Sequence, residues 1–376
     1  MKRKIIFLLC IIAFILPNIC FASDVDTEDI GNSLGLADVV NTLKEYTSEL
    51  DIEEISGEVM SGEGINYGYI GNFILEHLFS EIKGGIKIAL SVIIILVLLA
   101  VIKSLELEKD GTIANVTNLI GFLLITTILL KNYAANLQLF TETIKSLTQI
   151  VSIISPVMLG ILIATGEIVT SGIISPIILF LTSVIGIAVT YVIVPLLTLS
   201  LVLSIITSCS NVVKLDKLSG ICKTSAMWIV SVIFALFLGV LGLESSISTS
   251  IDGVTIKTTQ AAVSNLVPVV GKFLSDSLEV VMGASELIGK GVGIIGIIVL
   301  IIVLVIPLIK LIIISIIYKL LEAFSEAMLT EDKLSKIIGA FAKQYASISG
   351  VLIGVGATFI IAIGIVMSLF GKAVGG

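Results

Sequence analysis

The chain has 376 residues, of which 56% are hydrophobic and 14% are charged, and its mean hydropathy is +1.16. Soluble domains carry about 25% charged residues, so a water-soluble core of this length is excluded. The formal net charge is -7, with a single arginine and no basic patch. Nucleic acid is therefore not expected as a partner, because phosphate contacts need clustered Lys and Arg.

The N-terminus has the three parts of a secretory signal. Lys2 to Lys4 form a basic start, Ile5 to Leu16 an apolar run, and Cys20 to Ala22 a small-x-small cleavage site. We therefore predict a signal peptide over residues 1–22. The alternative is an uncleaved first membrane helix, although the apolar run is shorter than the roughly 20 residues that a span needs.

Residues 23–85 form the only sizeable polar region. Acidic residues crowd the stretch from Asp24 to Glu63 against the single Lys44, and a glycine-rich patch runs from Gly57 to Gly71. Behind a signal peptide, this region is an acidic extracytoplasmic leader. Its alternative structures are one or two amphipathic helices and a disordered segment.

Long apolar runs fill the rest of the chain. A charge-free run at 168–208 is long enough for two membrane spans. The run 291–318 contains Pro307 and Lys310, so two structures are possible for it: one tilted, kinked helix, or part of a tight hairpin. The fold class predicted is thus an all-α, polytopic transmembrane helix bundle in the cell membrane. Five further runs each match one span: 86–102, 112–130, 147–165, 224–243 and 348–370.

Lysines set the expected orientation, because cytoplasmic loops of membrane proteins carry an excess of Lys and Arg. With the leader outside, the lysine-bearing segments 103–111, 214–223 and 319–347 all fall on the cytoplasmic side. This count requires residues 244–290 to lie outside or to fold back without a net crossing.

The chain matches itself when 143–196 is aligned with 255–308 without a gap. The sequence Asp-Lys-Leu-Ser also recurs, at 216–219 and 332–335. We predict two parallel copies, 141–252 and 253–376, behind two N-terminal membrane helices over 86–140. The alternative is coincidence among apolar segments of low diversity. Four of the five prolines beyond the signal peptide pair in the ungapped alignment, as do two glutamates: Pro156 with Pro268, Pro195 with Pro307, and Glu167 with Glu279.

The second copy carries charge where the first is plain membrane helix. Charges inside lipid are costly, so the segment 251–290 is expected to be re-entrant or external, or to lie against protein or a water-filled cavity. Its charged residues include Asp252, Lys272, Asp276, Glu279, Glu286 and Lys290.

Eight residues are candidates for a structural or pathway role. Glu167 and Glu279 can relay protons or line an ion path, or Glu167 can cap a turn at the interface while Glu279 is simply hydrated. The four repeat-matched prolines create kinks that serve either as hinges or only as structure. Asp252 and Lys272 complete the set as charges of the segment 251–290.

Catalytic signatures are absent from the sequence. His77 is the only histidine, no P-loop motif occurs, and Cys209 and Cys222 lack the spacing of a zinc site. We expect no enzymatic activity, no metal and no cofactor, and we expect both cysteines to be free thiols, with a disulfide as the alternative. Three aromatic residues fit the interfacial belts of a membrane protein: Tyr318, Trp228 and Tyr345.

The segment from Ile251 to Gly271 resembles the stage III sporulation protein AE family of endospore-forming bacteria. Its pattern "DGV…K…AV…PVVG" is unusual for a membrane segment, and the resemblance extends over nearly the whole chain, most clearly from about Leu243 to Ala327. One departure is Lys272, which stands where a second glycine is expected after Gly271.

The resemblance implies a role in sporulation, in the mother-cell membrane around the forespore. Members of the family are thought to join other membrane proteins in a channel or feeding apparatus that supports forespore development. We therefore expect a core subunit of a channel or secretion-like complex. Its expected partners are the other membrane proteins of that complex and the lipid bilayer, and a homo-oligomer is also compatible. The alternative is a stand-alone secondary transporter or permease with midplane carboxylates.

Overall fold

The computed structural model describes residues 67–105, 112–209, 215–237, 270–328 and 332–370, together with Leu43 and Gly239. The predicted signal peptide and most of the predicted leader lie outside these ranges. The elements are α5 (Tyr67–Leu105), α6 (Thr112–Ala164), α7 (Ile168–Ala188), the π-helix η1 (Val189–Ile193), α8 (Val194–Cys209), a helix at Asp216–Phe237 called helix 216–237 below, α10 (Val270–Met328) and α11 (Asp332–Leu369).

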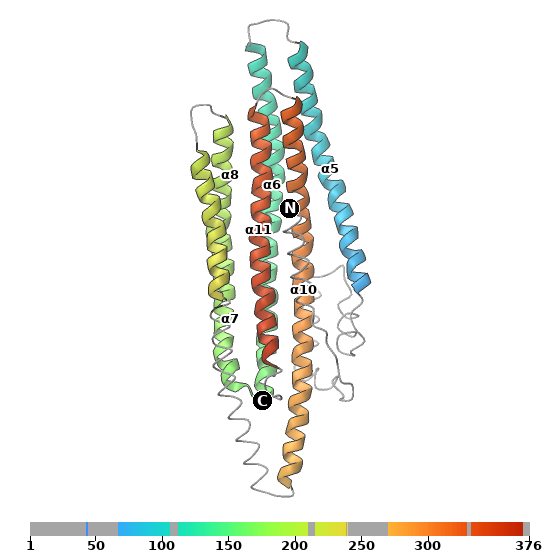
Figure 1. Ribbon diagram of the computed structural model, residues 1–376, viewed down its shortest axis with the longest axis vertical. Coiled ribbons are helices and arrows are strands. Elements are labelled where there is room, and N and C mark those ends of the chain that lie inside the picture. Colours follow the sequence, from blue (N-terminus) through green and yellow to red (C-terminus); the bar gives the residue numbers. More distant parts are fainter. Residues whose placement is uncertain are drawn as a thin grey trace.

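Six helical rods in this part of the chain are long and apolar enough to cross a membrane, with α7, η1 and α8 forming one continuous rod. The rods run along the long axis of the molecule and alternate in direction from one to the next (Figure 1). The predicted all-α, polytopic membrane bundle is therefore confirmed, and the chain is a multi-pass membrane protein.

The alternation gathers the lysine-bearing helix ends at one end of the bundle. There α5, α8 and α10 finish and α6, helix 216–237 and α11 begin (Figure 1). Lys223 Nζ donates to the backbone oxygen of Lys343 at 3.2 Å, which joins two of these regions directly. We call this the lysine end of the bundle. It is the end for which the lysine distribution predicts a cytoplasmic location.

The predicted spans 112–130 and 147–165 are not separate, because both are parts of the single helix α6. Residues 131–146 are polar, but they contain neither Gly nor Pro to end the helix. Their polar groups find partners within the helix instead. Gln138 Nε2 donates to Glu142 Oε1 at 2.8 Å, and the Thr141 and Thr143 hydroxyls donate to backbone oxygens one turn earlier.

Residues 168–208 form one rod, so the prediction of two spans there is wrong. Pro195 lacks an N–H group and its ring crowds the carbonyl of the preceding turn, which often breaks a helix. Here the preceding turn widens into η1, in which the Val194 N–H bonds to the oxygen of Val189. The π-helical turn absorbs the proline without ending the rod.

The two wrong span assignments do not change the predicted relation between the lysine-bearing segments. In each case two predicted spans form one rod, which removes one crossing, so the number of crossings between these segments falls by two. The segments stay on one side of the membrane, as predicted. The turn Thr165–Glu167, however, moves to the end of the bundle opposite the lysine end.

The centre of the bundle is formed by α6, α10 and α11. About half of the most apolar window of each of these helices is buried, against 22% to 28% for α5, the α7–α8 rod and helix 216–237. Every residue from 291 to 300 of α10 is buried. A helix that is apolar on every side belongs in an interior, and the outer helices carry the large exposed apolar side chains that suit lipid.

Helix α10 has 59 residues and a length of about 88 Å, far more than a bilayer core requires. Its first part, 270–290, is the described portion of the charged segment 251–290. It is continuous with the apolar part of the helix, and the interpretation of the segment as re-entrant or external stays a prediction. In Figure 1 the start of α10 projects beyond the ends of α6 and α7.

The predicted repeat boundary at 140/141 falls inside α6, and the repeat itself stays a prediction. Both Asp-Lys-Leu-Ser sequences lie at the start of the second helix of a hairpin, at 216–219 and at 332–335. The two copies differ elsewhere, because Glu167 lies in a turn whereas Glu279 lies inside α10.

Candidate functional site: a buried amide–tyrosine cluster

A cluster of neutral polar side chains lies where α6, α8, α10 and α11 meet. We call it the amide–tyrosine cluster. Its members are Asn132, Tyr133 and Asn136 of α6, Tyr318 of α10, and Gln344 and Tyr345 of α11, with the backbone oxygen of Leu197 of α8.

Asn132 is the acceptor at the centre of the cluster. Its Oδ1 receives the hydroxyl of Tyr318 at 3.1 Å and that of Tyr345 at 2.8 Å. Asn136 lies one turn further along α6, and its Nδ2 donates to the Tyr345 oxygen at 3.3 Å. Two amides thus tie three helices of the core together.

Gln344 extends the cluster to the outer rod. Its Nε2 donates to the backbone oxygen of Leu197 at 2.6 Å and to the Tyr133 hydroxyl at 3.4 Å. Leu197 follows closely after Pro195, so the contact falls next to the π-helical turn. The cluster therefore also positions α8 against α11.

The tyrosine rings pack edge to face. Tyr345 lies 5.4 Å from Tyr318 and 6.0 Å from Tyr133, centroid to centroid, with interplanar angles of 80° and 71°. Tyr318 is 1% and Tyr345 0% exposed. Their predicted place in an interfacial belt is therefore wrong, because a belt residue meets lipid headgroups whereas these rings fill the core. Trp228 is 67% exposed, and its belt role stays a prediction.

An ion pair joins α5 to α10 inside the apolar region. Lys310 Nζ lies 3.2 Å from Glu81 Oε1, with the two side chains about one third and one quarter exposed. The lysine interrupts an otherwise apolar run, and a charge at that depth is tolerated when it is paired. This pair fixes the height of the peripheral α5 against the core.

Glu167 occupies the N-cap position of α7, in the short turn that follows α6. Its side chain is 1% exposed, and its Oε2 accepts a hydrogen bond from Thr170 Oγ1 at 3.0 Å. The preceding Gly166 has φ 90°, a conformation that favours glycine. The residue thus stands in a tight turn at the end of a rod and not at the middle of a span, and its capping role stays a prediction.

The other predicted site residues are scattered. Pro156 lies inside α6 and Pro307 inside α10, and both helices continue through them. Glu279 and Lys272 lie on α10 within its projecting part, although their side chains are outside the described set. Pro268 and Asp252 lie outside the described residues. Those candidates that the structure describes are not gathered into one site.

The side chains of the cluster are suited to holding helices together and not to catalysis or metal binding. Its members are amides and phenols that satisfy one another, and within the described ranges no group of three His, Cys, Asp or Glu side chains is placed to hold a metal ion. Cys209 and Cys222 are free thiols in the structure, the first exposed and the second buried. What the arrangement does is to lock four helices in one register.

The amide–tyrosine cluster was not predicted from the sequence. The signal for it is the group Asn132, Tyr133 and Asn136 in a membrane helix, because amides in lipid need partners. A polar stretch between two apolar runs looks like a loop, however. The sequence also does not predict which of the distant tyrosines forms hydrogen bonds with these amides.

These features define a class: a polytopic membrane protein with six long apolar rods in the described part of the chain and an interior held by a neutral hydrogen-bond network. The family model described as Stage III sporulation protein AE matches residues 50–369. The chain therefore belongs to the stage III sporulation protein AE family, and the resemblance found in its sequence is confirmed.

One curated relative is the Stage III sporulation protein AE of Bacillus subtilis (strain 168). It is 25% identical over 256 residues, which cover 68% of this chain and 64% of the relative. The chain thus matches less than two thirds of the relative's length. No solved structure matches the chain.

Proposed function

We propose that this sporulation membrane protein is a core subunit of a channel or secretion-like complex that links mother cell and forespore and is needed for forespore development. In this proposal it resides in the mother-cell membrane around the forespore and has no enzymatic activity. Membership of the family supports a sporulation role. The observation that supports a place in an assembly is the apolar tip of the α5–α6 hairpin.

The hairpin tip consists of the exposed apolar residues near the turn between the two helices. It includes Leu98, Val101 and Ile102 of α5, and Leu119 and Ile120 of α6, each between 42% and 58% exposed. The hairpin itself ends further out than the lysine-end termini of α10 and α11 (Figure 1).

The height of the tip follows from the packing of α5 on α10. Glu81 pairs with Lys310, and Gly85 packs on Ile317, so the two helices run parallel and side by side. From the ion pair, α5 rises to Leu98 and α10 rises to the exposed Glu326. Both distances are about 25 Å along a helix.

Exposed apolar and exposed acidic side chains therefore stand at one height of the same bundle. A bilayer of uniform thickness suits one of them only. A contact with the membrane helices of a partner protein covers the tip and leaves the charged ends of α10 and α11 in water. Exposed apolar patches of this kind are typical of interaction sites.

The test is made in sporulating cells. Leu98→Gln combined with Ile120→Gln should leave the protein inserted, abolish its co-purification with the other membrane proteins of the complex, and lower forespore gene expression after engulfment. The matched control is Leu179→Gln with Ile187→Gln, which changes exposed residues of α7. Normal forespores after deletion of the gene would contradict the proposal.

A second candidate function, a secondary transporter, is favoured by the burial of Glu167. A proton-coupled carrier loses flux when its membrane carboxylate is neutralised. Glu167→Gln separates the two functions, because a scaffold carrying it still assembles and supports sporulation. Flux of a substrate into proteoliposomes that disappears with Glu167→Gln would favour the carrier.

A further inference from the structure

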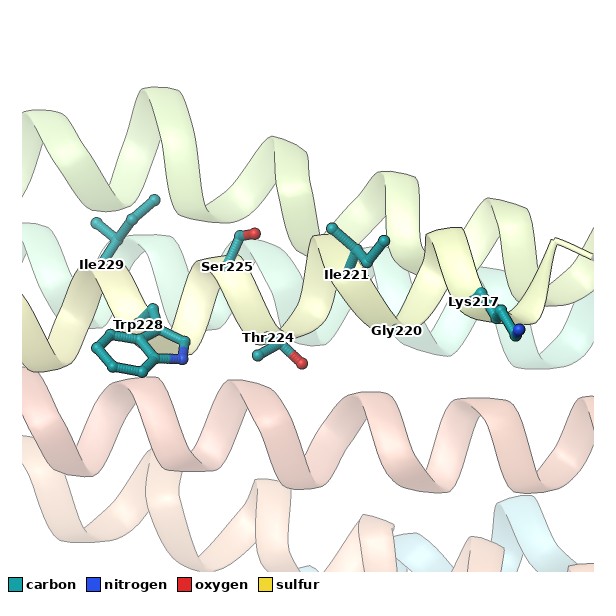
Figure 2. Close-up of a pocket in the computed structure, with 7 residues that line it drawn as sticks. All are labelled: Lys217, Gly220, Ile221, Thr224, Ser225, Trp228 and Ile229. Carbon is teal, nitrogen blue, oxygen red and sulfur yellow. The ribbon is translucent and has the colours of Figure 1, made fainter.

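A groove runs along the outer face of helix 216–237. It has a volume of about 660 Å³ and is lined by Lys217, Gly220, Ile221, Thr224, Ser225, Trp228 and Ile229. Figure 2 shows Thr224 and Trp228 directed toward the α11 side, and Ile221 and Ser225 toward the α8 side. The small residues at 220, 224 and 225 keep the middle of the groove open.

The groove has a charged end and an aromatic end. Lys217 is exposed at the start of the helix, and Trp228, which is 67% exposed, lies about 16 Å further along the helix axis. The surface between them is mainly apolar, with two hydroxyl groups. A ligand that fits has an anionic head and a long apolar part.

The groove is an open, shallow strip, because every residue that lines it belongs to helix 216–237. One extended acyl chain can lie along this strip beside the small residues Gly220 and Thr224.

The charged end of the groove lies among other lysines. Lys217 lies at the lysine end, near Lys223 and Lys343, which themselves are joined by a hydrogen bond. The cytoplasmic leaflet is rich in anionic lipids, which basic residues near its surface attract. We propose that the groove binds an anionic phospholipid of that leaflet, with Lys217 at the phosphate and one acyl chain lying along the helix as far as Trp228.

Trp228 is the only tryptophan of the chain, so its fluorescence reports on the groove directly. The full chain is reconstituted into phosphatidylcholine vesicles that contain brominated phosphatidylglycerol or, at the same bromine content, brominated phosphatidylcholine, with the bromines at mid-chain. The anionic lipid should quench Trp228 several-fold more strongly than the zwitterionic one. Lys217→Gln should abolish that preference.

Two matched controls make the test specific. Lys319→Gln removes another exposed lysine of the lysine end and should keep the preference. Gly220→Leu fills the groove, whereas Gly172→Leu makes the same change on α7, and a Cβ at either glycine meets no atom within 4 Å. Only the first should lower quenching by the anionic lipid.

Equal quenching by the two lipids overturns the proposal. A preference that Lys319→Gln removes as fully as Lys217→Gln overturns it too, because the cause is then the general surface charge. Free inorganic phosphate that competes with the lipid at equal strength shows an anion site without a place for the chain, and this also contradicts the proposal.

Discussion

Tyr345 stands at the junction of two hydrogen bonds inside the bundle, since its hydroxyl donates to Asn132 and accepts from Asn136. An aromatic residue in a membrane helix occurs both in interfacial belts and in protein cores. Which of the two places its side chain takes depends on contacts with residues far away in the sequence. Sequence reasoning predicts that Asn132 needs a partner, but it does not predict which tyrosine that is.

Tyr345→Phe should destabilise the protein by about 1 kcal/mol, because it removes both bonds of the hydroxyl while keeping the ring. Asn132→Leu should cost more, since the hydroxyls of Tyr318 and Tyr345 then lose their common acceptor. The measurement is the unfolding midpoint in mixed micelles, followed by circular dichroism. Tyr191→Phe, at a side chain 74% exposed, is the control and should change nothing. Equal midpoints for all three variants would show that the cluster contributes no stability.

Lys310→Met should destabilise the bundle because it leaves the Glu81 carboxylate without its cation. The cost should be smaller than the roughly 3–5 kcal/mol of a fully buried pair, since both side chains are partly exposed. Adding Glu81→Gln to Lys310→Met should restore part of the loss, as measured by a double-mutant cycle of unfolding free energies. Additive effects of the two changes would show that the pair is not coupled.

At the scale of elements, the apolar runs predicted that helices exist, because apolar length and the lack of charge decide which segments enter lipid. They did not predict where the helices end. Residues 131–146 and Pro195 look like interruptions, yet hydrogen bonds within α6 and the widened turn η1 carry the helices through. Continuity depends on whether polar groups find partners, and that is settled by tertiary contacts.

The packing of α5 on α10 depends on Gly85. A Cβ atom there would clash with Ile317 Cδ1, whereas a Cβ at the neighbouring Gly84 meets nothing within 4 Å. Gly85→Val should lower stability by about 1 kcal/mol, the low end of the cost of overpacking, because Ile317 Cδ1 is the far end of a flexible side chain, while Gly84→Val should not. Thermal unfolding of the two variants in detergent compares them directly. Similar melting temperatures would mean that α5 does not pack closely at Gly85.

At the scale of the whole molecule, the sequence predicted that the lysine-bearing segments share one side, and they do gather at one end of the bundle, although the sequence counted two crossings too many. They stay together because the two extra crossings fell between the same pair of lysine-bearing segments, and the cytoplasmic location of that end stays a prediction. In the described part of the chain, the resulting arrangement has six rods, three in the core and three at the periphery. The turn before α7 lies at the end of the bundle opposite the C-terminal ends of α8 and α10 (Figure 1).

The most direct test of this architecture is the accessibility of single cysteines to a reagent that does not cross membranes. With one cysteine left in the chain at a time, Ile168→Cys, at an exposed residue at the start of α7, should be labelled from one side of the membrane, and native Cys209 and Glu326→Cys only from the other. An arrangement with eight crossings places all three positions on the same side. Labelling of all three from one side would contradict the six-rod bundle.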